Sequence, residues 1–209
     1  MMPVIPAQAP AILALLQALL PAYWPAMPAP SFLAAQIEQE TCPSPQHRMC
    51  FSERAELRTA REYGFGLGQL TITPRFNVFE EVKRMHRDLV DWRFEDRFDR
   101  RRQLIALVVK DRAHFRSCSA LMADAPAALA CTAAQYNGGA GGFLADRRLC
   151  GNTSGCDPRQ WFGHIEHTST KAKTAVAGYG KSFFEINREY VRNVMQVRRA
   201  KYSPLMDAT

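Results

Sequence analysis

The first 37 residues form an apolar stretch, because no charged side chain precedes Glu38. Residues 11–20 read AILALLQALL, which is too short to cross a membrane, since a spanning helix needs about 20 apolar residues. No lysine or arginine precedes this run, although a signal peptide normally begins with basic residues. We expect a buried or amphipathic helix, with residues 1–30 packed as an apolar, proline-rich segment on a domain of residues 31–209. A signal peptide or reversible membrane anchor is the alternative.

A helical pattern follows at residues 31–41, where Ala34, Ile37 and Thr41 recur at spacings of three and four. This spacing places the three side chains on one face of a helix, for which Ser31 is the expected N-cap. Glu40 lies next to Thr41, so it should project at the edge of the buried face. Partial burial disfavours the charged form of a carboxyl group, and we expect Glu40 to keep its proton near neutral pH.

Alternation of polar and apolar positions, which is typical of a strand, is confined to residues 70–73. There Leu70 and Ile72 alternate with threonines. Residues 42–61 are polar and broken by prolines at first, and we expect them to become helical from Glu53 to Ala60. The remaining periodic segments have helical spacing, so the pattern predicts a mainly α fold with a small extended or β lobe.

The most hydrophobic of the later helices is expected at the centre of the fold and to end at Asp124-Ala125-Pro126, because proline breaks a helix. Another helix should begin at Asp157-Pro158, which offers an N-cap and a first-turn proline. The other expected helices cover residues 79–92, 103–122, 126–136, 141–149 and 183–201.

Composition narrows the class of protein. A chain of 209 residues that is 47% hydrophobic can bury one core, so a single domain is expected. The 27 basic and 20 acidic residues give a net charge of +7, which favours an anionic partner such as nucleic acid, a membrane surface or the bacterial wall. The mixed-sign run at residues 93–102 is typical of a solvated helix face. No nucleic-acid-binding motif is recognisable, so nucleic acid is not the expected partner.

The six cysteines are even in number and form no C-x-x-C pair, which favours disulfides over zinc or thioredoxin-type chemistry. Two pairs bracket short loops, and a third pair lies equidistant from the break at residues 124–126. Alanines near that break permit the close helix crossing that a disulfide needs. The predicted bridges are Cys42–Cys50, Cys118–Cys131 and Cys150–Cys156. Six reduced thiols in a cytosolic protein are the alternative.

Two glycine-containing segments are candidates for binding. Gly64, Gly66 and Gly68 fall within five positions, so the backbone can turn tightly and approach a ligand closely. Further along, Tyr136 and Asn137 close an alanine-rich helix, where glycines supply the stop.

A cluster at residues 164–167 contains His164, Glu166 and His167 but lacks the H-E-x-x-H spacing of a zinc site. We therefore expect no metal.

Four separated pieces of the chain occur in the order of a known set of motifs. Glu40-Thr41, Gly66-Leu67-Gly68-Gln69, Tyr136-Asn137-Gly138 and Tyr190-Val191 resemble Glu-Ser, Gly-Leu-Met-Gln, Ala-Tyr-Asn-X-Gly and Tyr-Val of the soluble-lytic-transglycosylase family in the lysozyme superfamily. The similarity extends from Ser31 to Tyr202. In the chain, Glu40 lies farther from Gly66 than in the family, which we interpret as an insertion of residues 42–61, and Gly68 replaces the usual methionine.

The resemblance implies a lysozyme-like helical domain whose β lobe lines a cleft, and Glu40 as the catalytic acid. By the same resemblance, Gly66, Leu67, Gly68 and Gln69 line sugar subsites, Tyr136 and Asn137 position the substrate's acetamido group and the acid, and Tyr190 supports Glu40. The residues alone leave other acids open for the catalytic role. These are Glu38, Glu53, Glu56 and Glu62, with Glu62 beside the glycine loop as the main rival.

The implied reaction is cleavage of the β-1,4 bond between N-acetylmuramic acid and N-acetylglucosamine in peptidoglycan, with formation of a 1,6-anhydro ring. One alternative is a muramidase that hydrolyses the same bond, for which Glu62, Asp157 or Glu166 would serve as second carboxylate. Another is a non-catalytic wall-binding or virion structural protein on the same fold. The chain most resembles a bacteriophage endolysin or virion-associated enzyme, expected to act as a monomer in the periplasm or cell wall without a cofactor.

Overall fold

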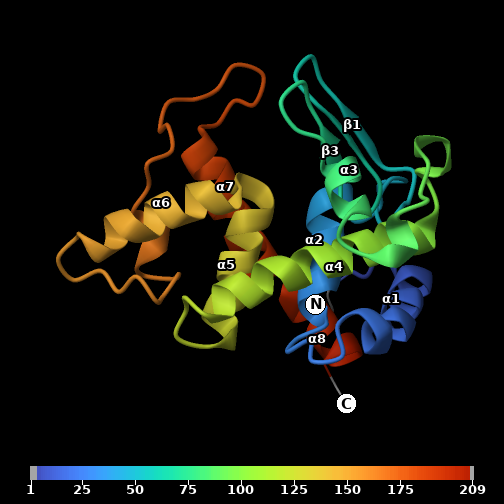
Figure 1. Ribbon diagram of the computed structural model, residues 1–209, viewed down its shortest axis with the longest axis horizontal. Coiled ribbons are helices and arrows are strands. Elements are labelled where there is room, and N and C mark those ends of the chain that lie inside the picture. The colour runs from blue at the N-terminus through green and yellow to red at the C-terminus, as the bar shows by residue number, and fades with distance from the viewer. Residues whose placement is uncertain (1–3, 208–209) are drawn as a thin grey trace. The chain divides into compact units, whose positions relative to one another are not determined.

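A computed structural model describes residues 4–207 and is mainly helical, with one small antiparallel sheet (Figure 1). This architecture confirms the predicted mainly α class with a small β lobe. The chain divides into two compact units, one formed by residues up to Arg112 and from Arg198 onward, and one formed by Ala113–Val197. The expected boundary between residues 30 and 31 stays a prediction.

Helix α2 (Ser31–Thr41) is the most deeply buried element of the first unit and packs against α8 (Arg199–Met206). Its residues from Ser31 to Glu38 are all buried. The expectation that Ser31 caps this helix is wrong, because Pro30 is at the N-cap position and Ser31 already lies in the first turn. Instead the carboxylate of Asp207 accepts from Ser31 N at 2.8 Å and from Ser31 Oγ at 2.6 Å. A negative charge at this end of the helix is favourable, since the helix dipole is positive there.

Helix α1 (Ala9–Tyr23) forms from the apolar run, as predicted, and belongs to the first unit. Its apolar side chains are buried on one face. Its polar groups reach other parts of the same unit: Gln17 Nε2 donates to Leu205 O at 3.2 Å, and Tyr23 OH donates to Asp88 at 2.5 Å.

The sheet is a meander of β1 (Glu56–Arg58), β2 (Tyr63–Phe65) and β3 (Leu70–Ile72). Strand β3 confirms the alternation in the sequence, but the helix expected over residues 53–60 is wrong, because β1 lies there. A turn closed by Thr59 joins β1 to β2: its Oγ1 accepts from the N–H groups of Arg61 and Glu62 at 3.1 Å. Such side-chain turns compete with helix formation.

A cluster of aromatic rings joins strand β2 to the segment that follows the sheet. The rings of Phe65, Phe79, Trp92 and Phe94 have centroids 4.9 to 6.5 Å apart. The helix expected over residues 79–92 is shorter in the structure. In this range the structure has α3 (Val78–Lys83) and a single-turn helix, Arg87–Leu89. A second single turn, Phe94–Asp96, follows in the charged run.

The second unit contains the C-terminal part of α4 (Arg100–Ser119), α5 (Ala125–Gly138), α6 (Ala140–Gly151) and α7 (Phe183–Arg192). Helix α5 packs on both α6 and α7. The predicted break before α5 is confirmed, because Asp124 Oδ1 accepts from Ala127 N at 2.8 Å and caps the helix.

Two helices expected in this unit differ in the structure. Residues 157–164 form turns rather than a helix, because Asp157 Oδ1 accepts from Arg159 N at 2.8 Å, and Gly163 has a φ of 77°. A single helical turn follows at Ile165–His167. The last expected helix is split into α7, a π-helical segment (Asn193–Arg198) and α8.

The six cysteines, all within residues 4–207, form the three predicted disulfides. The Cα atoms are 4.2 Å apart in Cys42–Cys50, 5.9 Å in Cys118–Cys131 and 5.3 Å in Cys150–Cys156. The second of these joins α4 to α5 inside the second unit.

Replacing Cys118 and Cys131 by alanine should lower the free energy of unfolding by about 3 kcal/mol, because the bridge closes a loop of 13 residues. Both half-cystines are completely buried, so the loss of packing adds to this effect. Urea denaturation measures the change. The matched control replaces Cys150 and Cys156 by serine, which opens a loop of 6 residues and should cost less. Free thiols at positions 118 and 131 in non-reducing peptide mapping would contradict the assignment.

Candidate active site

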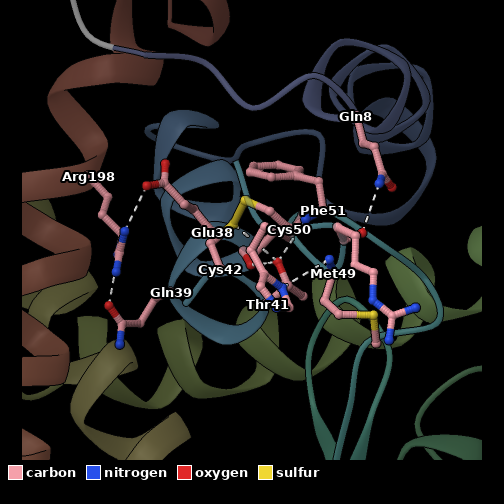
Figure 2. Close-up of a disulfide and its surroundings, with 12 residues drawn as sticks. Gln8, Glu38, Gln39, Thr41, Cys42, Met49, Cys50, Phe51 and Arg198 are labelled. Atoms are coloured by element: carbon pink, nitrogen blue, oxygen red, sulfur yellow. Dashed lines mark hydrogen bonds and ion pairs between the residues drawn. A yellow bond between two sulfur atoms is a disulfide. The ribbon is translucent and has the colours of Figure 1, made fainter. Parts of the chain in front are cut away.

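Glu40 lies in the last turn of α2 and is half-buried, whereas most of the helix is fully buried. Three contacts fix this end of the helix. Cys42 N donates to Glu38 O at 3.0 Å, and Thr41 Oγ1 accepts from Phe51 N at 2.9 Å. The Cys42–Cys50 disulfide closes the segment between them, as Figure 2 shows. The backbone that carries Glu40 is therefore held by covalent and polar links directly after it.

Glu38, one of the alternative acids, lies on the same helix but is completely buried and fully engaged. Its Oε1 accepts from Arg198 Nη1 at 2.7 Å and from Lys201 Nζ, and its Oε2 accepts from Tyr202 OH. Burial and this hydrogen bond raise the pKa of the Tyr202 phenol, so the phenol keeps its proton and donates. Arg198 also donates to Gln39 at 2.8 Å, as Figure 2 shows. Glu38 thus serves to hold α2 against α8.

The other alternative acids lie near the sheet. Both carboxylate oxygens of Glu53 accept from Arg100 Nη2, at 3.1 and 3.2 Å. Glu56 accepts from Tyr63 OH and lies 3.9 Å from Arg97 Nη2. Glu62 occupies the partly exposed turn between β1 and β2. Ionic partners therefore engage Glu53 and Glu56. The choice between Glu40 and its rival Glu62 stays a prediction.

The glycine loop is a tight turn between β2 and β3, with Gly66, Leu67 and Gly68 all buried. Gly66 has a φ of 78°, and a Cβ there would lie 2.5 Å from the side chain of Gln103. Gln103, on α4, accepts from Leu67 N at 2.9 Å. Its amide nitrogen donates to the carbonyls of Glu53 and Arg97 at 2.9 and 2.8 Å. Gln103 therefore fixes the loop, a role that its position in the sequence did not suggest.

Gln69 ends this turn, with a φ of 43°, and its side chain folds back over the loop. The amide nitrogen donates to Gly66 O at 2.9 Å and to Ala55 O at 3.1 Å. A Cβ on Gly64 would lie 2.9 Å from Gln69 Oε1, so the two residues approach closely. Among the described residues, Gln69 Oε1 is buried without a hydrogen-bond donor. The amide nitrogen thus braces the turn.

Tyr136 and Asn137 lie at the end of α5 in the second unit, and Tyr190 lies on α7 of the same unit. Asn187, one turn before Tyr190, donates from Nδ2 to Asn137 Oδ1 and to Ala134 O, both at 3.1 Å. Tyr190 is 5% exposed. The structure therefore places these three predicted residues on two packed helices and adds Asn187 as the link between them. The acid and the glycine loop both belong to the first unit.

A buried ionic cluster supports this pair of helices. Asp146 on α6 is completely buried and accepts from Lys171 Nζ at 2.6 Å, from Arg188 Nη1 at 2.9 Å and from Thr170 N at 2.9 Å. Arg188 Nη1 also donates to Asn187 Oδ1 at 3.0 Å. Burial raises the pKa of Asp146, but the hydrogen bonds from Lys171 and Thr170 and the charge of Arg188 outweigh it, so the pKa is lowered.

The possible second carboxylates and the histidine cluster named from the sequence have local contacts in the second unit. Asp157 N donates to His164 Nδ1 at 3.0 Å, and His167 Nε2 lies 3.5 Å from Glu166 Oε1. Among residues 4–207 there is no group of three or more side chains that could hold a metal ion.

Replacing Asp146 by asparagine should lower the free energy of unfolding by about 3 to 5 kcal/mol at pH 7, because Lys171 and Arg188 lose their buried counter-charge. The lowered pKa means that this contribution is present above the unfolded-state value of about 3.9 and is lost as pH falls through the folded-state value. Denaturation from pH 3 to pH 8 should show that the difference in free energy of unfolding between the wild type and Asp146→Asn becomes smaller at the acid end. The matched control is Glu189→Gln at the exposed pair with Lys181, which should change stability by less than about 1 kcal/mol. If the difference between the wild type and Asp146→Asn does not depend on pH, Asp146 does not act as the buried counter-charge.

The described helices include none that is long and apolar enough to span a bilayer. In comparisons with known proteins, no family model, no curated protein and no solved structure matches the chain.

Proposed function

We propose that the chain is a peptidoglycan lytic transglycosylase that cleaves the β-1,4 bond between N-acetylmuramic acid and N-acetylglucosamine, with Glu40 as general acid and base. The observation that carries the proposal is the environment of Glu40. Glu40 is a half-buried carboxyl group in the last turn of an otherwise buried helix, and the Cys42–Cys50 disulfide and the hydrogen bond from Phe51 N to Thr41 Oγ1 fix the backbone directly after it. The order of the four motifs along the chain supports the same assignment.

In the proposed reaction, protonated Glu40 donates its proton to the glycosidic oxygen as the bond to the muramyl C1 breaks. The acetamido carbonyl of the substrate stabilises the positive charge at C1. The Glu40 carboxylate then takes the proton of the muramyl 6-hydroxyl, whose oxygen bonds to C1 and closes the 1,6-anhydro ring. The acid recovers its proton within one cycle, and no second carboxylate or cofactor is needed.

The contacts around the other motif residues support roles in holding the sugar. Gln69 Nε2 holds the glycine loop by donating to Gly66 O and Ala55 O, which fixes the segment that we assign to the sugar subsites. Asn137 is exposed, and its Oδ1 accepts from Asn187, which leaves its amide nitrogen to donate to an acetamido carbonyl. The partner is therefore a glycan strand of peptidoglycan, and the net positive charge favours this anionic polymer.

We also propose that the protein acts outside the bacterial cytoplasm, as a bacteriophage endolysin or virion-associated enzyme. The three disulfides support this location, because disulfides persist in oxidising compartments.

Glu40→Gln should retain the fold and lower the rate of lysis by at least about a hundredfold, because the amide is nearly isosteric but cannot donate or accept the proton. Turbidity loss of permeabilised cells measures lysis, and circular dichroism checks the fold. Glu62→Gln is the matched control and should stay active. Lysis that survives Glu40→Gln and disappears with Glu62→Gln would move the acid role to Glu62.

A further inference from the structure

One face of α2 meets the central helix α4 through a buried polar contact. Gln36 lies one turn before Glu40, and its Nε2 donates to Asp111 Oδ1 on α4 at 3.5 Å. Both Gln36 and Asp111 are completely buried. The contact therefore lies in the interior of the first unit, one turn of α2 before the half-buried Glu40.

Each of these two side chains has one further oxygen. Within residues 4–207, neither Gln36 Oε1 nor Asp111 Oδ2 has a hydrogen-bond donor, although both atoms are buried. An unsatisfied buried polar group costs about 1 to 3 kcal/mol, and more if it carries charge. A carboxylate offers only acceptors, so an ionised Asp111 cannot satisfy Gln36 Oε1. A protonated carboxyl group has an O–H donor.

We propose that Asp111 is protonated at neutral pH and forms an acid–amide pair with Gln36, through which Asp111 acts as a positioning residue for the face of α2 that carries Glu40. In this pair the Gln36 N–H donates to Asp111 Oδ1, and the Asp111 O–H donates to Gln36 Oε1. A single proton thus provides partners for both remaining atoms.

The charged groups around the pair agree with this state. Burial raises the pKa of Asp111 well above its usual value, and the charge of Glu40 raises it further, while the neighbouring charge of Lys110 and the Gln36 hydrogen bond lower it. Lys110 is itself buried, and burial lowers its pKa against the opposing charges of Asp111, Glu81 and Glu40. Burial is therefore the dominant influence on both side chains of α4.

A neutral Asp111 has a consequence for Glu40, which rests on the proposed function. Once Glu40 has given up its proton it carries a negative charge, and an ionised carboxylate nearby would repel that charge. A protonated Asp111 does not repel it, and Lys110 attracts it. The acid–amide pair therefore holds α2 in place without opposing the second step of the reaction.

The protonation is tested without reference to activity, by carbon NMR of the carboxyl groups in the full chain. At pH 7 the wild type should show a neutral carboxyl signal that disappears in Asp111→Asn. The raised pKa also predicts that the stability contributed by Asp111 is present below the unfolded-state value of about 3.9 and is lost as pH rises through the folded-state value. As the pH rises from 4 to 8, the unfolding midpoint of Asp111→Asn should therefore rise relative to that of the wild type. An ionised signal at pH 7, or a difference that shrinks with rising pH, overturns the proposal.

The positioning role is tested by turnover on isolated glycan strands. Asp111→Leu should lower kcat about tenfold with KM unchanged, because loss of the pair shifts the acid. Asp111→Asn, which can form an amide–amide pair with Gln36, should recover most of that loss. Equal losses in both variants overturn the positioning role. A wild type that is inactive on these strands, yet shows the neutral carboxyl signal, would refute the proposed function and leave the protonated pair standing.

Discussion

The buried carboxylate of Glu38 sets the strongest constraint on the first unit, because a charged group is tolerated in a protein interior only when it is fully paired. Its partners, Arg198, Lys201 and Tyr202, come from the last turns of the chain. Removing all of them would leave a buried charge without compensation. This requirement explains why residues from Arg198 onward belong to the same unit as α2, although about 160 positions separate them.

The same constraint gives the candidate acid its environment. Asp207 holds the first turn of α2, Glu38 holds its middle, and the Cys42–Cys50 bridge follows its last turn. Glu40 therefore projects from a helix that has little freedom to move. Glu38 and Glu40 are two residues apart, yet one is enclosed by cations and the other is half-exposed. Such differences in environment allow neighbouring carboxyl groups to have different roles.

Much of the helical framework follows from local signals that the sequence displays. Helix α2, the break before α5 and all three disulfides were predicted, because apolar spacing, helix-breaking prolines and short loops act within a few residues. The failures are places where a local alternative or a distant partner decides the structure. Thr59 closes a hairpin where a helix was expected. At the start of α2 the hydrogen-bond acceptor is the distant Asp207 carboxylate and not the Ser31 side chain.

The candidate site was predicted less completely than the fold. The motif residues could be named, but the groups that hold them could not, since Gln103 lies 36 positions from Leu67 and Asn187 lies 50 positions from Asn137. The cluster of Asp146, Lys171 and Arg188 likewise joins three segments that share no local pattern. Long-range polar pairing of this kind is visible only once the helices are packed.

The central claim concerns the bond that is broken and the ring that is formed. Mass spectrometry of the muropeptides that the purified protein releases from isolated sacculi tests it most directly. The proposed reaction gives products that end in 1,6-anhydromuramic acid and are lighter by one water than hydrolytic products. Reducing ends throughout would contradict the transglycosylase reaction and indicate a muramidase, and the absence of released muropeptides would contradict an enzymatic role.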